Sequence, residues 1–508
     1  MLSLLMLVNG CALYGQSKAA KANAYAASYA VVVSKDTLAK PEWKTVVDAL
    51  VAKHKNAQVI SYDGNLNNAL PALRQAFPKY TCFVAQPEEA GIRQVMQAHR
   101  MTRKLDDDPY GDTLWGFITG YTAQDALRLA QATAPTVVNT ALITAGVGTH
   151  RYKDVFYISD STPGEFGWKH ADGTTENKNL GSLDQTQQYI GEFERLDPDV
   201  IISSGHASQR NLEMPFSKGN IVCKDGKLFG YLAKERLIDQ AGQAKQAKVV
   251  GELLPIGEAR RPKLFLPIGN CLIADIPDRN CMALAWLGYG KVNQMIGYTE
   301  TTWFGAMGWG LMRYWEQMGG VAPANEAFFF TNQYLLSDLI QKYPKTANAE
   351  FDLANQKDTD AGMQAIVKSM QTENSGQKMT RAEMTENMGL LWDRDIVVLY
   401  GDPALEVRLD SQYVSPQHTI KFEKVGKDQY RVVVHANTDH GVPNKDSAPV
   451  GIFFPYRLDR AEVLQGAEFK PVITDNFLLV TVPGPWKAGQ DYSILFRAKL
   501  AAAPQKTK

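Results

Sequence analysis

Two short apolar runs of the sequence each lead to a side chain that could do nucleophilic chemistry. Segment 200–208 carries His206 directly after a glycine, and segment 263–271 ends at Cys271 shortly after a glycine. An imidazole can accept the proton of a thiol, and the thiolate can attack a carbonyl carbon. Ligands of open α/β sheets bind at the carboxyl ends of the strands. If these two strand ends are neighbours in space, the sequence predicts a hydrolytic site.

Both side chains also have ordinary structural interpretations. An isolated histidine after a strand is more often a hydrogen-bonded structural residue than a catalyst. A free cysteine is usually buried, as we expect for Cys82 and Cys281. His150 follows another strand end and is the rival imidazole, although we expect it to face solvent. We expect no catalytic role for the remaining histidines, which are His54, His99, His170, His418, His435 and His440.

The elements that must position these residues belong to a long, electrically balanced chain. Its 508 residues are enough for roughly three domains. Lys plus Arg and Asp plus Glu each number 54, which argues against a nucleic-acid footprint or an anionic membrane surface. Five cysteines in such a length do not indicate a disulfide framework, and without a CxxC or HExxH motif we expect no metal site.

The first residues resemble an export signal. The apolar stretch before Cys11 is too short to span a bilayer and lacks the positive start of a secretory signal. Residues 8–11 resemble a bacterial lipobox, which makes Cys11 a candidate for lipidation. We therefore expect an extracytoplasmic protein, either lipid-anchored or secreted. An ordinary frayed N-terminus is the alternative.

Alternating strands and helices predict an α/β region in two parts, after a signal and tether at 1–27. Residues 28–138 form the first predicted subdomain and residues 139–411 the second. The predicted strands are 29–34, 58–62, 80–85, 113–119, 140–145, 199–204, 263–268, 292–298 and 395–400. The predicted helices are 43–54, 69–77, 122–132, 183–195, 303–318 and 326–340, and the third is predicted to begin with a capping box formed by Thr122 and Asp125. Residues 207–262 are expected to insert a hairpin at 220–231 and a polar helix, and 344–390 to form surface helices.

The pattern changes after residue 411. Residues 412–500 contain short alternating runs separated by turn residues, which suggest an all-β immunoglobulin-like sandwich. The expected strands are 419–422, 430–434, 450–454, 477–482 and 492–496. Residues 501–508 are expected to be a loose tail.

Taken together, the motifs resemble those of the gingipain-like cysteine peptidases of the caspase-like clan. Segments 205–208 and 269–273 match the histidine and cysteine motifs, and 107–112, 296–299 and 399–405 match flanking ones. Gly401-Asp402-Pro403 is the most specific part. The resemblance covers roughly residues 29–499 and is strongest from 199 to 405. It implies a caspase/gingipain-like doubly wound sheet in two subdomains, followed by the sandwich.

The resemblance also implies a mechanism. Cys271 would be the nucleophile and His206 the general base and acid. The backbone N–H groups of Cys271 and Ala207 would form the oxyanion hole. The family has glycine where this chain has Ala207. Alanine keeps the N–H, but a positive φ there would cost about 1–2 kcal/mol.

Substrate recognition is less clearly encoded. The resemblance places Trp303 near an aromatic wall of the substrate pocket, and a core aromatic is the alternative. A pocket for basic side chains needs a carboxylate, for which Glu300 and Asp108, with its neighbours Asp106 and Asp107, are candidates. A surface acidic run is the alternative for the aspartates. No cofactor is expected, and calcium is conceivable in this family although no EF-hand-like loop supports it.

These observations predict an exported cysteine endopeptidase that acts on polypeptide substrates. They predict no nucleic-acid partner and no membrane contact except through an N-terminal lipid, and they leave the oligomeric state open. The alternative is a catalytically inactive caspase-like module for surface binding or scaffolding, which the alanine at position 207 favours. A nucleotide-binding enzyme is disfavoured because no strand leads into a GxGxxG or GxxxxGK[ST] loop.

Overall fold

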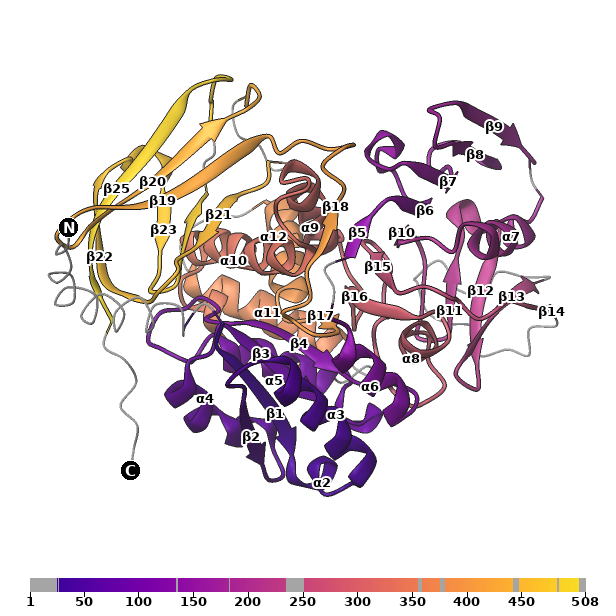
Figure 1. Cartoon of the computed structure of the whole chain (residues 1–508), viewed down its shortest axis with the longest axis horizontal. Helices are drawn as coiled ribbons and strands as arrows, with labels where there is room; N and C mark the ends of the chain where they lie inside the picture. Colours follow the sequence, from indigo (N-terminus) through magenta and orange to yellow (C-terminus); the bar gives the residue numbers. More distant parts are fainter. Residues whose placement is uncertain are drawn as a thin grey trace, which may run out of the picture.

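A large mixed sheet organises the computed structural model (Figure 1), which describes residues 25, 27–133, 136–181, 183–233, 251–354, 359–374, 380–441, 447–481 and 484–501. Within these residues the sheet has 12 strands in the order β2-β1-β3-β4-β17-β16-β15-β10-β6-β7-β8-β9. Their bounds are β1 Tyr29–Ser34, β2 Gln58–Tyr62, β3 Tyr80–Val84, β4 Leu114–Ile118, β6 Thr140–Thr144, β7 Asp154–Ile158, β8 Glu165–Lys169, β9 Thr175–Asn179, β10 Val200–Ser203, β15 Lys263–Pro267, β16 Val292–Tyr298 and β17 Val397–Tyr400.

Two parallel halves meet in this sheet. Strands β1 to β4 and β17 run one way, and β16, β15, β10, β6 and β7 run the other way, joined by the antiparallel pair β16–β17. The carboxyl ends of β10, β15 and β16 therefore lie at the same edge as the amino ends of β17 and β4. Strand β17 follows the second predicted α/β set in sequence but pairs with β4 of the first.

Helices surround this sheet, and their bounds agree closely with the predicted ones where a prediction was made. They are α2 Lys35–Leu38, α3 Pro41–Lys53, α4 Leu70–Ala76, α5 Ile92–Thr102, α6 Ala123–Gln131, α7 Thr186–Leu196, α8 Met282–Gly288, α9 Ala306–Gln317, α10 Ala324–Lys342, α11 Thr359–Glu373 and α12 Arg381–Asp393. The capping box predicted at Thr122 is confirmed, because Thr122 and Asp125 exchange the two bonds that satisfy the first turn of α6.

The insertion after β10 forms a small antiparallel sheet. Its strands are β11 Asn211–Glu213, β12 Asn220–Lys224, β13 Lys227–Ala233 and β14 Gly251–Pro255. The β12–β13 pair confirms the predicted hairpin. The predicted polar helix falls in 234–250, outside the described residues, as do the signal-like segment with Cys11 and most of the predicted tail.

Two antiparallel sheets follow the α/β region and share a core. One has the order β19-β20-β25-β22 and the other β21-β24-β23. Their bounds are β19 His418–Gly426, β20 Gln429–Ala436, β21 Val450–Phe453, β22 Leu458–Gln465, β23 Pro471–Ile473, β24 Phe477–Val480 and β25 Asp491–Leu500. In Figure 1 the strands of these two sheets are coloured orange to yellow and lie beside α10. The rings of Phe329 and Phe330 on α10 contact those of Phe453 and Phe477 in tilted or edge-to-face arrangements, which fixes the sheets to the α/β region.

The expected surface helices of 344–390 are present, because α11 and the first turns of α12 carry mostly exposed or half-buried residues. Just beyond that range, the last turn of α12 is buried at Leu391, Trp392 and Asp393. Strands β7 to β9 were not predicted. No helix among the described residues is long and apolar enough to span a membrane.

Candidate active site

The two strand ends that carry the histidine and the cysteine are neighbours. Strands β10 and β15 pair in parallel, with Ser203 opposite Pro267, and both turn at the same edge of the sheet. Adjacent strands lie about 4.8 Å apart, so the loops that follow them start side by side. This confirms the condition on which the predicted hydrolytic site depended.

Asn270 ties the two loops together. Its side chain is fully buried; Ser203 Oγ lies 2.6 Å from Asn270 Oδ1, and Asn270 Nδ2 donates to the Gly205 carbonyl at 3.0 Å. One amide thus fixes the end of the histidine strand from the residue next to Cys271. The sequence reading missed this role, although a polar residue between a buried strand and a reactive cysteine was the available signal.

The turn at His206 places its special backbone conformation at a glycine. Gly205 has φ +117°, with open space where a Cβ would lie. Ala207 is buried, is not among the positive-φ residues, and pairs with Leu212 in an antiparallel bridge. The strain considered for Ala207 is therefore absent. Within the described part of the chain, the backbone N–H groups of Ala207 and Cys271 donate to no backbone carbonyl.

The imidazole of His206 is exposed to solvent. Among the described residues it forms no hydrogen bond with Cys271, and its loop is held by a backbone bond from Glu213 N to its carbonyl, at 3.0 Å. The rival His150 is also exposed, as predicted. It lies in a single 3₁₀ turn after β6.

Cys271 is partly buried, and its sulfur contacts Thr302 in place of a histidine. The Thr302 backbone N–H donates to Sγ at 3.4 Å, and Sγ lies 3.9 Å from the Thr302 carbonyl oxygen. Burial raises the pKa of the thiol; Asp393 and Glu300 raise it further, and the Thr302 N–H lowers it. The next residue, Leu272, has φ +61°, a left-handed conformation that costs a branched side chain about 1–2 kcal/mol.

Two buried carboxyl groups lie near the Cys271 thiol. Glu300 is 3% exposed and accepts the Thr301 N–H at 2.8 Å, and burial raises its pKa to about 7. Asp393, at the end of α12, accepts the Thr302 hydroxyl at 2.7 Å, and burial raises its pKa to about 7. Sequence reasoning missed Asp393, which lies between the predicted surface helices and the predicted strand 395–400 and belongs to no motif.

The aromatic side chains beside the thiol remain largely open. Trp303 is 40% and Phe304 is 51% exposed, directly after Thr302. They pack across Gly389 of α12, where a Cβ would approach both residues to within about 3 Å. Trp303 is thus an exposed aromatic next to the cysteine rather than a core residue.

Asp108 lies elsewhere on the same edge of the sheet. It precedes β4, which is separated from β15 by β17 and β16. The carboxylates of Asp106, Asp108 and Asp112 lie within 4.8 Å of one another, a spacing that could hold a metal ion. Asp106 and Asp108 also line a cavity of about 390 Å³, together with Arg100 and Lys104. Burial raises the pKa of Asp108 to about 7.

Asp402, from the most specific motif of the resemblance, performs a structural task. Its carboxylate is fully buried, pairs with Lys53 at 2.6 Å and His54 at 2.8 Å, and accepts the Tyr29 hydroxyl at 2.9 Å. Although burial alone would raise it, these partners lower the pKa of Asp402 to about 2. The motif therefore fixes β17 to β1 and α3.

The remaining described cysteines are buried. Cys82 lies in β3 and Cys281 caps α8, as predicted, and Cys223 lies in β12. Burial raises the pKa of Cys281 and of Cys223 to about 12. Among the described cysteines, only Cys271 is partly accessible.

Comparisons with known proteins add little. No family model and no curated protein matches the chain. Two solved structures are similar at low level. A chain described as "Structure of Protease" has a TM-score of 0.36 and 10% identity, covering 93% of this chain and 95% of the other. The complex of Porphyromonas gingivalis RgpB pro- and mature domains has a TM-score of 0.34 and 11% identity, covering 90% and 93%. Likenesses this weak carry no weight for function.

Proposed function

We propose that the chain is a gingipain-like cysteine endopeptidase, with a caspase-like α/β region in two subdomains followed by an immunoglobulin-like sandwich. The observation that carries the proposal is the adjacency of the Cys271 and His206 loops at the carboxyl ends of paired strands, tied by Asn270. The sequence resemblance described above supports the same reading.

In this proposal the Cys271 thiolate attacks the scissile carbonyl carbon and forms a tetrahedral intermediate. The N–H groups of Cys271 and Ala207, which donate to no backbone carbonyl among the described residues, stabilise the oxyanion. His206 takes the thiol proton and gives it to the leaving amine, so that the C–N bond breaks and a thioester remains. Water, deprotonated by His206, then hydrolyses the thioester and restores the thiol.

The mechanism requires the imidazole to approach the sulfur. His206 is exposed and follows a glycine at φ +117°, so its side chain has room to turn toward the Cys271 sulfur. Catalytic hydrogen bonds are often long or poorly aligned in unliganded enzymes and tighten when substrate binds. A peptide lying between the two loops would complete the arrangement.

Substrate contacts are proposed for the aromatic pair after β16. Trp303 offers an open face beside the thiol, and Glu300 supplies a carboxyl group for a basic side chain. Asp108 belongs to a separate acidic cluster before β4 and would contact only distant parts of a substrate. Export, with lipid on Cys11 or by secretion, completes the proposal; no cofactor is invoked.

An inactive caspase-like binding or scaffold module is the second candidate. Two observations favour it: the His206 ring forms no hydrogen bond with Cys271, and burial with two nearby carboxyl groups raises the pKa of the thiol. Both disfavour a preformed thiolate–imidazolium pair.

Labelling with a peptidyl probe that alkylates thiols separates the two candidates. The wild-type chain should be labelled at Cys271, Cys271→Ala should not be labelled, and His206→Ala should be labelled much more slowly. Cys223→Ala, which alters a buried thiol in the insertion, is the matched control and should label like wild type. Equal labelling of wild type and His206→Ala would support the inactive module.

A further inference from the structure

The residue that contacts the Cys271 sulfur is itself hydrogen-bonded to a buried carboxyl group that the proposed mechanism does not use. Asp393 is fully buried, and its Oδ2 accepts the Thr302 hydroxyl at 2.7 Å. The same hydroxyl oxygen accepts the Gly305 N–H at 2.9 Å. Thr302 is therefore held from both sides, which fixes its backbone N–H against the Cys271 sulfur at 3.4 Å.

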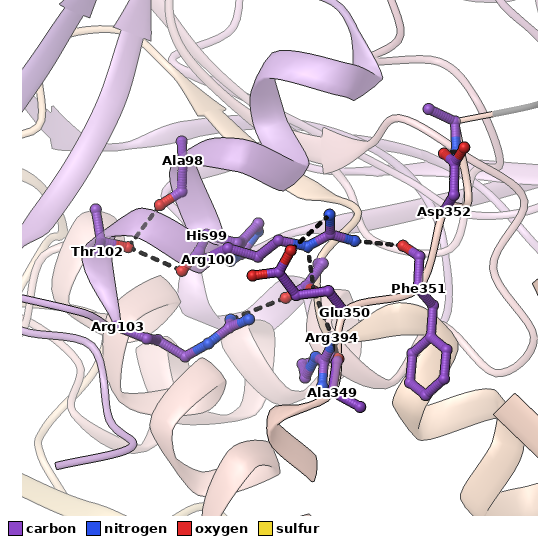
Figure 2. Close-up of polar contacts among 12 residues, drawn as sticks. Ala98, His99, Arg100, Thr102, Arg103, Ala349, Glu350, Phe351, Asp352 and Arg394 are labelled. Carbon is purple, nitrogen blue, oxygen red and sulfur yellow. Dashed lines mark hydrogen bonds and ion pairs between the residues drawn. The ribbon is translucent and has the colours of Figure 1, made fainter. Parts of the chain in front are cut away.

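The last turn of α12, which carries Asp393, is itself rigidly anchored. The adjacent Arg394 and Asp395 join a buried ion network, with Asp395 contacting Arg394 at 2.7 Å and Arg103 at 2.8 Å. Figure 2 shows Arg100, Arg103 and Arg394 converging from α5 and the end of α12. Although burial opposes it, the two guanidinium groups hold the pKa of Asp395 well below its usual range. The Trp392 indole N–H also donates to the Thr301 carbonyl at 2.8 Å.

The two contacts of Thr302 with the Cys271 sulfur shift the pKa of the thiol in opposite directions. A backbone N–H pointing at sulfur favours the thiolate, whereas a carbonyl that accepts from S–H favours the thiol. No cation among the described residues pairs with Asp393, so a negative charge there acts on the sulfur uncompensated. The other ionisable groups that face this corner are Glu300 and the Tyr298 hydroxyl.

We propose that Asp393 is a positioning residue: through Thr302 it holds a backbone N–H against the Cys271 sulfur, while its own negative charge keeps the resting thiol protonated. This inference builds on the proposed role of Cys271 and adds regulation at the same site. A substrate or partner that neutralises Asp393, or that favours its protonated form, allows the Cys271 thiol to ionise. The Thr302 N–H that stabilises the thiolate is then already in place.

The test follows the pH dependence of Cys271 alkylation by iodoacetamide, read by mass spectrometry of the Cys271 peptide in the full chain. Asp393→Asn keeps an oxygen for the Thr302 hydroxyl and removes the charge. Its pH–rate midpoint should fall by about half to one pH unit relative to wild type. Glu316→Gln is the matched control. Glu316 is a largely buried carboxyl on α9 whose pKa burial also raises to about 7, but it pairs with Arg151. Its midpoint should not move.

The anchoring role is isolated by a variant that lacks both charge and oxygen. Asp393→Ala should have a midpoint clearly above that of Asp393→Asn, because Thr302 is no longer held. If Asp393→Ala does not fold, Thr302→Val in the Asp393→Asn background removes the same bond and should give the same upward shift. An unchanged midpoint in Asp393→Asn would overturn the electrostatic part, and equal midpoints for the Asn variant and the variant without the bond would overturn the anchoring part.

Alkylation requires no peptide turnover, so the two proposals fail separately. A chain that cleaves no peptide can still show the Asp393 shift, which would leave this inference intact and refute the peptidase. If the chain cleaves peptides but the pH–rate midpoint of Cys271 alkylation does not change in the Asp393 variants, the peptidase proposal stands and this inference is refuted.

Discussion

Two buried aspartates stand on either side of strand β17, and their surroundings differ in every respect that governs ionisation. Asp402, after the strand, has Lys53, His54 and the Tyr29 hydroxyl as partners, which lower its pKa to about 2 despite burial. Asp393, before the strand, has only uncharged partners, chiefly the Thr302 hydroxyl, and burial raises its pKa to about 7. One carboxylate is committed to its ionised form, and the other changes form near neutral pH.

This difference indicates a structural role for Asp402 and a functional role for Asp393. A buried carboxylate with cationic partners stabilises a fold only above its titration range, and removing it leaves its partners uncompensated. A buried carboxyl whose pKa is raised to near neutrality destabilises the fold as pH rises toward that pKa, and such groups cluster at functional sites. The residue of the pair that matches a family motif is the scaffold residue, and the residue that faces the cysteine matches no motif.

The largest effect that tests this comparison is on stability. Asp402→Ala should lower the free energy of unfolding by about 3–5 kcal/mol, because Lys53 and the Tyr29 hydroxyl lose a buried partner. Urea denaturation measures it. Asp48→Ala, which removes an exposed carboxylate from α3, the helix that carries Lys53, is the control and should cost no more than about 0.5 kcal/mol. A small effect of Asp402→Ala would contradict the scaffold role.

Acid titration tests the same pairing without changing the sequence. The pKa of Asp402 in the folded chain is about 2, below its ordinary value of 3.8. Its contribution is therefore complete above about pH 4 and is lost as pH falls toward 2, a loss of about 2 kcal/mol. Thermal melts between pH 5 and 2 should show this decline, and Asp402→Asn should flatten it. An identical decline in that variant would assign it to other carboxylates.

A third prediction concerns the amide that joins the two loops. Asn270→Ala should cost about 2 kcal/mol, because the Gly205 carbonyl and the Ser203 hydroxyl lose a buried partner, and it should slow probe labelling of Cys271 at least tenfold. Ser203→Ala removes only one of the two bonds and should cost about half as much. Denaturation and labelling under conditions where both variants are folded measure the two effects. If Asn270→Ala is labelled as fast as wild type, the contact between the two loops does not control the reactivity of Cys271.

The smallest predicted effect is at position 207. Ala207 does not have a left-handed backbone, so Ala207→Gly should leave probe labelling within about twofold of wild type and lower stability by about 0.5–1 kcal/mol. A tenfold gain in labelling would show that the alanine obstructs the site, which would favour the inactive module for the natural chain.

The sequence predicted elements and local geometry well and long-range partners poorly. Strands β1, β2 and β16 were predicted with their observed bounds, and the Thr122 capping box was predicted because both members lie within one turn. Strand β9, by contrast, has no buried residue and so carries no apolar alternation. Nothing local relates Asp393 to Cys271, since only the antiparallel β16–β17 junction brings them together.

The candidate site shows the same limit. The thiol and the imidazole could be predicted because each follows a strand whose apolar residues are visible in the sequence. Thr302 could not be predicted, because its role depends on which way the chain turns after β16. The role of Asp402 could not be predicted either, because its partners Lys53 and His54 lie far away in the sequence.

Hydrolysis of a peptide library by the full chain is the decisive measurement for the proposed Cys271 peptidase. We expect wild type to cleave a subset of peptides, Cys271→Ala to abolish cleavage, and His206→Ala to reduce kcat/KM by about 10²–10⁴-fold. Cleavage that persists in Cys271→Ala, or a wild-type chain that cleaves no peptide while folded and alkylated at Cys271, would contradict it.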